Sequence, residues 1–387
     1  MPQGVEHQQL YLDNAATSFP KPEAVYQAMD AFARTSLANP GRAGHKMALA
    51  SERILDDARH LLNQLFHGKD PERFVFTLNC TDALNMAFKG VLTEGDHVIT
   101  TDLEHNSVSR PLRAMELAGR ISLTRIPSDS GGTIDPDAIL KAITRETQLI
   151  ALTHASNVLG TIQPILEVGR IAREHDLLFL VDAAQTAGVV PIDIQSMYID
   201  LLAFPGHKSL LGPTGTGVLY AGPRARIQPW REGGTGGDSS SETQPCDLPY
   251  SLEGGTPNVL GVAGLAAGIR YVQERGMQAI HEHEVDLIER LWRRLDELPG
   301  YQVFGHRDRS RRVATLSLKS EMLSAAEVGG ILDQSFDIAV RPGLHCAPYI
   351  HRALGTFPDG TVRVSPGPFS TTEDIDRLAT AVAEIAL

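Results

Sequence analysis

The chain has 387 residues, of which 42% are hydrophobic and 21% are charged, and its formal net charge is −12. This length predicts two domains, or one large domain with an appendage. The acidic balance argues against a nucleic-acid partner, and no apolar run is long enough to span a bilayer. The polar N-terminus lacks a signal-peptide core, and the three distant cysteines have no metal-ligand spacing. We therefore expect a cytoplasmic protein without a metal site or a membrane partner.

Short apolar segments alternate with amphipathic ones from about residue 73 to residue 220. Strands are predicted at residues 74–77, 97–100, 121–126, 149–153, 178–181 and 201–204. Helices are predicted at residues 81–92, from residue 106, from residue 135 and at residues 165–174. Continuous apolar strands separated by helices indicate a mostly parallel sheet that is buried on both faces.

The C-terminal third has a different pattern. Residues 230–258 are rich in Gly, Ser, Thr and Pro and lack periodicity, and a loop of this length usually indicates function or disorder. The elements predicted after it are helices at residues 259–275, 277–298, 325–334 and 372–387, and strands at residues 313–318, 338–341 and 361–364. We expect a large domain over residues 15–260 and a smaller C-terminal α+β domain over residues 261–387, with residues 1–14 packing nearby.

Two charged side chains that follow predicted strands define the candidate chemistry. Asp182 ends an apolar strand, and Lys208 lies between Gly206-His207 and a glycine-rich turn. A lysine amine for a Schiff base and a carboxylate for the pyridine nitrogen are what pyridoxal 5'-phosphate (PLP) requires of a protein. Either residue alone is more often an ordinary loop acid or a solvated lysine. The pair favours a PLP site, because ligands of parallel sheets bind at the carboxyl ends of the strands.

Other polar side chains can complete such a site. Gln185 can reach the phenolic oxygen of the same ring. Asn79-Cys80-Thr81-Asp82 opens a helix directly after a strand, where backbone N–H groups and Thr81 can bind a phosphate, although an ordinary helix cap predicts the same residues. His207 is a second candidate phosphate ligand.

Two more polar residues follow strand ends. His105 can stack on a flat cofactor, and Asn157 can bond its ring oxygen, although each alone is more often an ordinary loop residue.

The segment Arg341-Pro342-Gly343-Leu344-His345-Cys346-Ala347-Pro348 contains a candidate nucleophile. Cys346 lies in a tight loop bounded by Pro and Gly, with Arg341 and His345 as candidate positive neighbours for a thiolate. The alternative is a buried small hydrophobe, the usual fate of a free cysteine. Arg363 interrupts an apolar strand and can clamp an α-carboxylate with two hydrogen bonds, unless it is a surface residue of an edge strand.

These motifs resemble those of class V aminotransferase-type enzymes of PLP fold type I, and among them the cysteine desulfurases. The Arg-x-Gly-x-His-Cys-Ala-Pro loop resembles group II, the selenocysteine-lyase-like branch, and no long Ser-rich cysteine loop of group I is present. The resemblance covers nearly the whole chain through Tyr11–Thr17, Glu104-His105, Ser156–Gly160, Asp182-x-x-Gln185, Gly206-His207-Lys208, Gly255–Asn258 and Val362–Ser365. It implies an α/β fold with a mixed, mostly parallel seven-stranded sheet in the large domain.

The resemblance also implies roles for the site residues. Lys208 forms the Schiff base and shuttles a proton, and Cys346 receives the sulfur. The other implied cofactor contacts are His105 on the ring face, Asp182, Gln185, Asn157, and Cys80, Thr81 and His207 near the phosphate. Arg363, Asn157, Arg341 and His345 are the implied substrate contacts. Thr256 is implied to reach the phosphate of the other subunit's cofactor, which predicts a homodimer.

The chain departs from the family pattern at Pro205, where relatives often have a phosphate-binding serine, and at Asp82, which replaces a frequent glutamate. Phosphate binding must then depend on the remaining groups. The expected activity is conversion of L-cysteine to L-alanine, with a persulfide on Cys346 for a sulfur-acceptor protein. The alternatives are a selenocysteine lyase acting on L-selenocysteine, or another class V enzyme, such as a C–S lyase or an epimerase, in which Cys346 is incidental. A scaffold without turnover is disfavoured, because no catalytic residue is missing.

Overall fold

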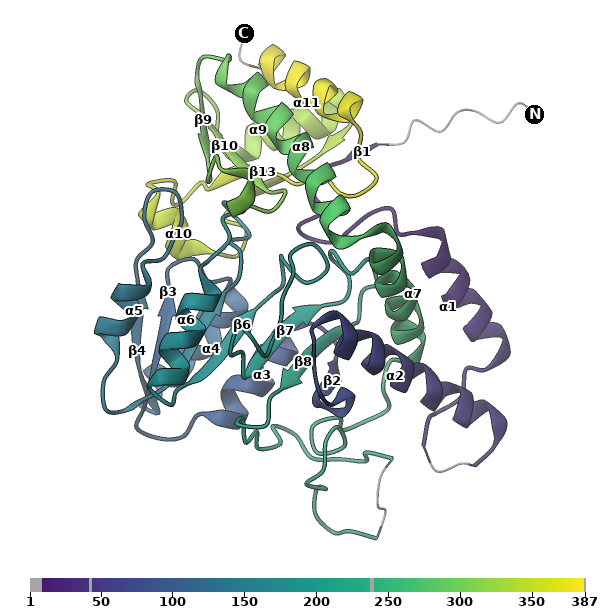
Figure 1. Cartoon of the computed structure of the whole chain (residues 1–387). Coiled ribbons are helices and arrows are strands. Elements are labelled where there is room, and N and C mark those ends of the chain that lie inside the picture. The colour runs from purple at the N-terminus through teal and green to yellow at the C-terminus, as the bar shows by residue number, and fades with distance from the viewer. Residues whose placement is uncertain (1–8, 42–43, 237–239, 386–387) are drawn as a thin grey trace, which may run out of the picture.

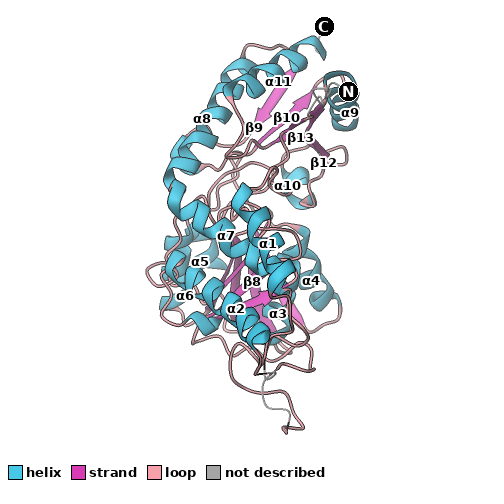
Figure 2. Cartoon of the chain, turned by 90° about the vertical axis from the view of Figure 1, so that its right-hand side faces the viewer, coloured by secondary structure: helices cyan, strands magenta, loops and turns pink. Residues whose placement is uncertain are grey.

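The computed structural model describes residues 9–41, 44–236 and 240–385. Figure 1 shows a larger lower part, built around one sheet, and a smaller upper part that contains the C-terminal elements. Figure 2 shows the same division from the side, with helix α10 (Pro348–Ala353) lying between the two parts. No helix in the described ranges is both long and apolar enough to cross a membrane.

The large sheet has the strand order β2-β8-β7-β6-β5-β3-β4. Its strands are β2 (Phe74–Thr77), β3 (Asp96–Thr101), β4 (Ile121–Ile126), β5 (Thr147–Thr153), β6 (Leu178–Asp182), β7 (Leu201–Pro205) and β8 (Gly217–Ala221). The pairs among β3 to β7 are parallel, and β8 runs antiparallel to both of its neighbours. The expected mixed, mostly parallel seven-stranded sheet is therefore confirmed, although its strand β8 was not among the predicted segments.

Helices cover both faces of this sheet, because its strands are apolar on both faces. Phe74 and Phe76 contribute to one buried cluster, and Val75 between them contributes to another. The helices between the strands are α3 (Cys80–Val91), α4 (Asn106–Leu117), α5 (Pro136–Ala142) and α6 (Ile165–Glu174). Helices α1 (Glu23–Thr35) and α2 (Lys46–Leu65), which were not predicted, pack against α7 (Val259–Arg275).

The smaller part contains a four-stranded antiparallel sheet of order β12-β13-β10-β9. Its strands are β9 (Tyr301–Phe304), β10 (Leu316–Ser320), β12 (Arg341–Gly343) and β13 (Thr361–Val364), and its helices are α8 (Met277–Asp296), α9 (Ala325–Phe336) and α11 (Thr372–Ile385). Ile350 of the intervening helix α10 belongs instead to the core of the large sheet. The strand predicted at residues 338–341 is in fact two strands of different sheets. One of them, β11 (Ile338–Ala339), pairs with β1 (Leu10–Tyr11).

Separate hydrophobic cores support the two parts. Leu265 and Ile269 of α7 belong to the core of the large sheet, whereas Leu287 and Ile288 of α8 belong to the core of the smaller part. Leu10 and Leu12 near the N-terminus also contribute to the second core. The expected domain boundary between residues 260 and 261 thus falls inside α7, and the change of core occurs at the junction of α7 and α8, where Gly276 has a φ of 87°.

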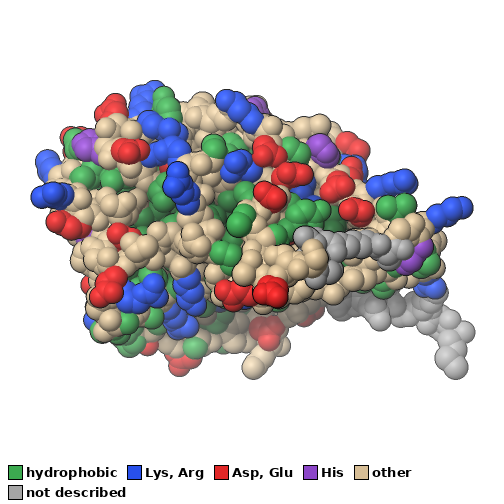
Figure 3. All heavy atoms as spheres, turned by 90° about the horizontal axis from the view of Figure 1, so that it is seen from below, with side chains coloured by type: hydrophobic (Ala, Val, Ile, Leu, Met, Phe, Trp, Pro, Cys, Tyr) green, Lys and Arg blue, Asp and Glu red, His purple; other side chains and the backbone are tan. Residues whose placement is uncertain are grey.

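Figure 3 shows that Lys and Arg side chains alternate with Asp and Glu side chains on the face seen from below, with hydrophobic side chains between them. A nucleic-acid-binding face would instead gather basic side chains into one patch.

Candidate functional site

A cavity of about 210 Å³ lies at the carboxyl ends of the parallel strands. It brings together ten of the expected residues: Cys80, Thr81, His105, Asn157, Asp182, Gln185, His207, Lys208, Arg341 and Arg363. Three others, Thr256, His345 and Cys346, are not part of its wall. The cavity is also lined by Ala15, Ala16 and Ser107, which sequence reasoning did not single out.

Asp182 ends β6 and is only 3% exposed. Its Oδ1 accepts hydrogen bonds from the Ala184 N–H at 2.9 Å and from the Cys80 thiol at 3.7 Å. Burial raises the pKa of Asp182, and the Ala184 N–H and the Lys208 ammonium oppose this effect. Desolvation makes an ionised carboxylate costly unless a cation faces it, so a protonated pyridine nitrogen is a suitable partner.

Lys208 follows β7 in a tight turn. Its carbonyl accepts hydrogen bonds from the Leu211 N–H at 2.8 Å and the Ser18 hydroxyl at 2.9 Å, which fix the backbone. Burial, followed by the positive charge of Arg363, lowers the pKa of Lys208 to about 8. A substantial fraction of the amine is therefore neutral and nucleophilic at neutral pH, as Schiff-base chemistry requires.

His105 caps the N-terminus of α4 through its side chain. Its Nδ1 accepts a hydrogen bond from the Ser107 N–H at 3.1 Å, which assigns the proton of the neutral ring to Nε2. Burial, followed by the charges of Lys208 and Arg341, lowers the pKa of His105 to about 4. The ring is neutral at physiological pH and can stack on a protonated pyridine ring without repulsion between two cations.

Ser107 connects two of the expected residues. Its hydroxyl lies 2.9 Å from Nδ1 of His105 and 2.8 Å from Oγ1 of Thr81. It thus links His105 to the candidate phosphate end of the cavity. The only sequence signal for this role was its position two residues after His105 at the start of the helix.

The candidate phosphate end of the cavity lies at the N-terminus of α3. Asn79 caps this helix by accepting from the Asp82 N–H at 2.9 Å, and the cavity is lined here by Cys80 and Thr81 at the first helical positions, where N–H groups lack intrahelical partners. Nδ1 of His207 is buried without a hydrogen-bond partner in the described part of the chain. A buried polar atom of this kind requires a partner, and a phosphate oxygen would satisfy it. The site therefore fits PLP even though Pro205 replaces the frequent serine.

Arg363 lies on β13, an inner strand, and is 1% exposed, so it is not a surface residue of an edge strand. Its Nη2 donates to the Asp13 carboxylate at 2.6 Å, and its Nη1 donates to the Asn157 carbonyl at 3.1 Å. The Nε atom is buried and has no partner among the described residues. The guanidinium is thus fixed in the cavity wall with a free donor, which suits a substrate carboxylate.

Sequence reasoning did not identify Asp13 as the acid that orients Arg363. The two residues are 350 positions apart. No local pattern relates them, although Asp13 lies in one of the family motifs.

The loop with Cys346 has an unusual backbone. His345 and Cys346 have φ values of 49° and 59°, in the left-handed region that residues with a Cβ rarely adopt. Hydrogen bonds hold both carbonyls: Asn157 Nδ2 donates to the His345 carbonyl at 2.7 Å, and the Asn106 N–H donates to the Cys346 carbonyl at 2.6 Å. The loop is therefore anchored to the cavity wall.

Arg341 is the positive neighbour of the thiol. Its Nη2 lies 3.7 Å from the Cys346 Sγ, and Arg341 also lines the cavity. His345 does not have this role, because burial lowers its pKa well below the usual value and leaves it neutral. Its ring instead hydrogen-bonds Thr361 Oγ1 at 3.1 Å, so the expectations of a charged His345 and of a substrate contact by its side chain find no support in this geometry.

Thr256 is exposed and lines a separate groove of about 700 Å³. The groove runs between the start of α2 and the long loop before α7, and it also exposes Leu49 and Tyr250. Within this one chain, Thr256 does not reach the cavity that contains Lys208.

Comparison with known proteins assigns this chain to a family. The model of the class-V aminotransferases matches residues 10–378. A probable cysteine desulfurase of Halalkalibacterium halodurans is 35% identical, over 96% of this chain and 91% of that protein. A cysteine desulfurase of Cronobacter sakazakii is 31% identical, over 97% of this chain and 93% of that protein.

Solved structures agree with these matches. The apo structure of a cysteine desulfurase from Thermococcus onnurineus NA1 has a TM-score of 0.92 and 33% identity, and the matched region covers 98% of this chain and 94% of that one. The cysteine desulfurase CsdA of Escherichia coli has a TM-score of 0.87 and 30% identity, with the same coverage of both chains. These likenesses confirm the expected PLP fold type I, and the chain belongs to the class-V aminotransferase family.

Proposed function

We propose that this protein is a PLP-dependent cysteine desulfurase that converts L-cysteine to L-alanine and collects the sulfur as a persulfide on Cys346. The observation that carries this proposal is the Cys346 loop, whose carbonyls are fixed and whose thiol lies 3.7 Å from Arg341, a residue of the Lys208 cavity wall. A purely structural cysteine would not require a strained, anchored backbone beside a guanidinium. The cysteine desulfurases among the relatives support the same activity.

Different residues of the cavity have different roles in this reaction. PLP bound at Lys208 supplies an electron sink for the charge that develops at the substrate Cα. Asp182 would hold the ring nitrogen protonated, and the neutral His105 ring would pack against the ring of the cofactor. The Lys208 amine, with a pKa lowered to about 8, can take a proton from the substrate Cα and give it back at a later step.

We expect Arg363 and Asn157 to bind the substrate. Arg363, held by Asp13, offers its free Nε to the α-carboxylate of cysteine, and Asn157 lies beside it. The Cys346 thiolate, close to the Arg341 guanidinium, then attacks the substrate sulfur. As the new S–S bond forms, the substrate Cβ–S bond breaks, and its electron pair stays with the carbon fragment, which takes up a proton and leaves as alanine. The persulfide remains on the protein, and a sulfur-acceptor protein removes its terminal sulfur.

We also infer a homodimer in which the second copy covers the groove around Thr256. Large apolar side chains are exposed here: Leu49 at 40% and Tyr250 at 42% line the groove, and Leu78 at 53% lines an adjoining pocket that also contains Thr256. Apolar surface of this kind is typical of an interface. Covering it would allow Thr256 of one chain to approach the phosphate end of the other chain's cavity. Sedimentation of the holoenzyme at low concentration tests this inference, and a monomer with full PLP occupancy would contradict it.

The products distinguish this activity from the alternatives. A desulfurase releases alanine from L-cysteine, whereas a C–S lyase releases pyruvate, and neither product would form if the enzyme were an epimerase. Parallel assays with L-cysteine and L-selenocysteine test the preference for sulfur over selenium. The three cysteines in the chain are free, which supports our proposal of a reducing, cytoplasmic location.

A further inference from the structure

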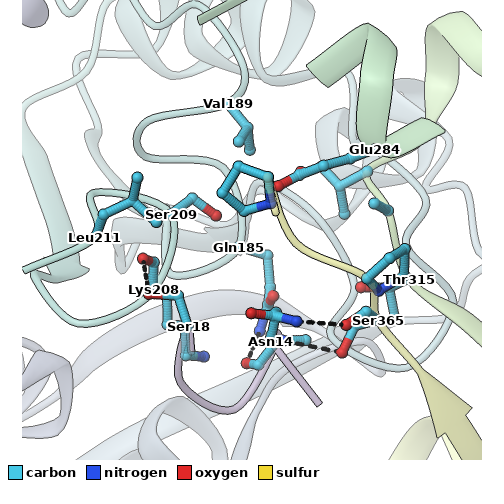
Figure 4. Close-up of a pocket in the computed structure, with 15 residues that line it drawn as sticks. Asn14, Ser18, Gln185, Val189, Lys208, Ser209, Leu211, Glu284, Thr315 and Ser365 are labelled. Carbon is cyan, nitrogen blue, oxygen red and sulfur yellow. Dashed lines mark hydrogen bonds between the residues drawn. The ribbon is translucent and has the colours of Figure 1, made fainter. Parts of the chain in front are cut away.

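A second pocket lies behind the cofactor cavity, where α8 of the smaller part meets loops of the larger part. It has a volume of about 30 Å³ and shares Ala15, Gln185 and Lys208 with the cofactor cavity. Figure 4 shows Glu284 reaching from α8 toward the middle of this pocket, above Gln185 and Asn14. The volume is enough for one or two water-sized particles.

Glu284 is a buried acid without a partner. It is 7% exposed, and it makes no hydrogen bond or ion pair with any residue that the structure describes. Burial alone raises the pKa of Glu284 to about 8, because no charged side chain is close enough to offset the loss of solvation. A buried carboxyl in this position lacks the compensation that folded proteins normally supply.

The surroundings of Glu284 provide no protein cation. Lys208 is the one charged residue, besides Glu284, among the described residues that line the pocket, and it makes no contribution to the pKa of Glu284. On α8 itself, His281 and His283 each point a ring nitrogen at a backbone carbonyl, those of Arg312 and Ser370. At a pH where Glu284 is ionised, its counter-charge would therefore have to come from outside the described part of the chain.

The pocket is rich in oxygen atoms and poor in N–H donors. The amide nitrogens of Asn14 and Gln185 already donate to the carbonyls of Ser365 and Ala15, and none of the described residues donates to the side-chain oxygen of Gln185. Two lining prolines, Pro366 and Pro368, have no N–H group.

The hydroxyls of Ser209 and Thr315 also lie in the wall, and neither bonds another group in the described part of the chain. One carboxylate among neutral oxygens is a poor site for a divalent or transition metal, and the described residues contain no cluster of three or more His, Cys, Asp or Glu that would hold one.

We propose that this pocket binds a single monovalent cation, Na⁺ or K⁺, with the Glu284 carboxylate as its one charged ligand and neutral side-chain oxygens completing the shell. The bound ion would connect α8 of the smaller part to Gln185 and Ser209 of the larger part. It would thereby brace the junction of the two parts directly behind the lysine and glutamine of the cofactor cavity. The proposal does not depend on which reaction the enzyme catalyses.

The test is the thermal unfolding of the cofactor-loaded protein in chloride salts of equal ionic strength. At alkaline pH, Na⁺ or K⁺ should raise the unfolding temperature in a saturable way by roughly 2 °C or more, whereas tetramethylammonium, which is too large for the pocket, should not. Binding to the carboxylate must displace its proton, so the apparent affinity should fall roughly tenfold for each pH unit below the pKa of Glu284. Glu284→Gln should abolish the salt-specific shift.

Glu282→Gln is the matched control, because Glu282 is exposed on the same helix and pairs only with Gln278. It should keep the full response to Na⁺ or K⁺. A response that survives in Glu284→Gln, or an equal response to tetramethylammonium, would overturn the proposal. If Glu284→Gln does not fold, calorimetry of the wild type in buffers of different ionisation enthalpy decides: proton release on adding the ion supports the site, and its absence means that the pocket holds water only.

Discussion

Lys208 should react with the aldehyde of PLP much faster than a surface lysine at neutral pH. Its pKa is lowered to about 8, whereas an ordinary lysine titrates near 10.4, so near pH 7.5 the neutral fraction is about 0.24 for Lys208 and about 0.001 for an ordinary lysine. The neutral amine is the nucleophile, and this difference alone gives an advantage of roughly 200-fold.

The assay mixes apoenzyme with PLP and follows the Schiff-base absorbance from about pH 6 to about pH 10. The initial rate should rise with pH up to about 8 and then level off, because the Lys208 amine is by then mostly neutral. Borohydride reduction followed by peptide mass spectrometry should place the adduct on Lys208, and Lys208→Ala should remove it. Lys46→Ala and Lys89→Ala are the controls, since both lysines are exposed. A rate that keeps rising tenfold per unit beyond pH 9, or an adduct on Lys46 or Lys89, would refute the reasoning.

Three further substitutions test other parts of the account. Asp182→Asn keeps a side-chain oxygen that accepts from Ala184 and Cys80, but it cannot hold the ring nitrogen protonated. We therefore expect kcat to fall by roughly 100-fold or more, while the protein still folds and borohydride reduction still traps PLP. Near-normal turnover would contradict the pairing of Asp182 with the ring nitrogen. Arg363→Lys replaces a planar donor by a point charge and should raise the KM for L-cysteine by roughly tenfold, with a smaller change in kcat; an unchanged KM would remove Arg363 from the substrate site. Burial raises the pKa of Glu104 from 4.5 to about 8, so the folded state retains a proton that the unfolded chain releases. The stability that the protonated Glu104 contributes is therefore lost as the pH rises from about 4.5 through 8. Glu104→Gln should therefore flatten the fall in unfolding temperature between pH 6 and pH 9, and an unchanged slope would argue against a protonated Glu104.

The elements of the large sheet were predictable because each strand carries its own apolar signal. The strands predicted near residues 74, 121 and 201 agree with β2, β4 and β7 to within a residue. Strand β8 was missed because its apolar segment directly follows a glycine-rich run, and helix α1 was missed because it lies before residue 73, where the alternation of strands and helices begins.

The site residues also fall into two groups. A local sequence pattern identifies some of them, whereas the roles of the others depend on contacts between segments far apart in the sequence. Asp182, Lys208 and Cys80 could be identified because each follows a strand, and strand ends converge on one edge of a parallel sheet. Arg341 could be paired with Cys346 because five positions separate them in one loop. The buried pair of Arg363 and Asp13 and the neutrality of His345 arise from packing between the two parts of the molecule, which no local pattern records.

The most direct test of the central claim is mass spectrometry of the holoenzyme after incubation with L-cysteine. The peptide that contains Cys346 should gain the mass of one sulfur atom, alanine should accumulate, and replacement of Cys80 or Cys246 should leave the sulfur on Cys346. Cys346→Ala should still change the cofactor spectrum on adding L-cysteine, but it should form no persulfide and release no alanine. Alanine release by Cys346→Ala at the wild-type rate, or a persulfide on another cysteine of the wild type, would contradict the account.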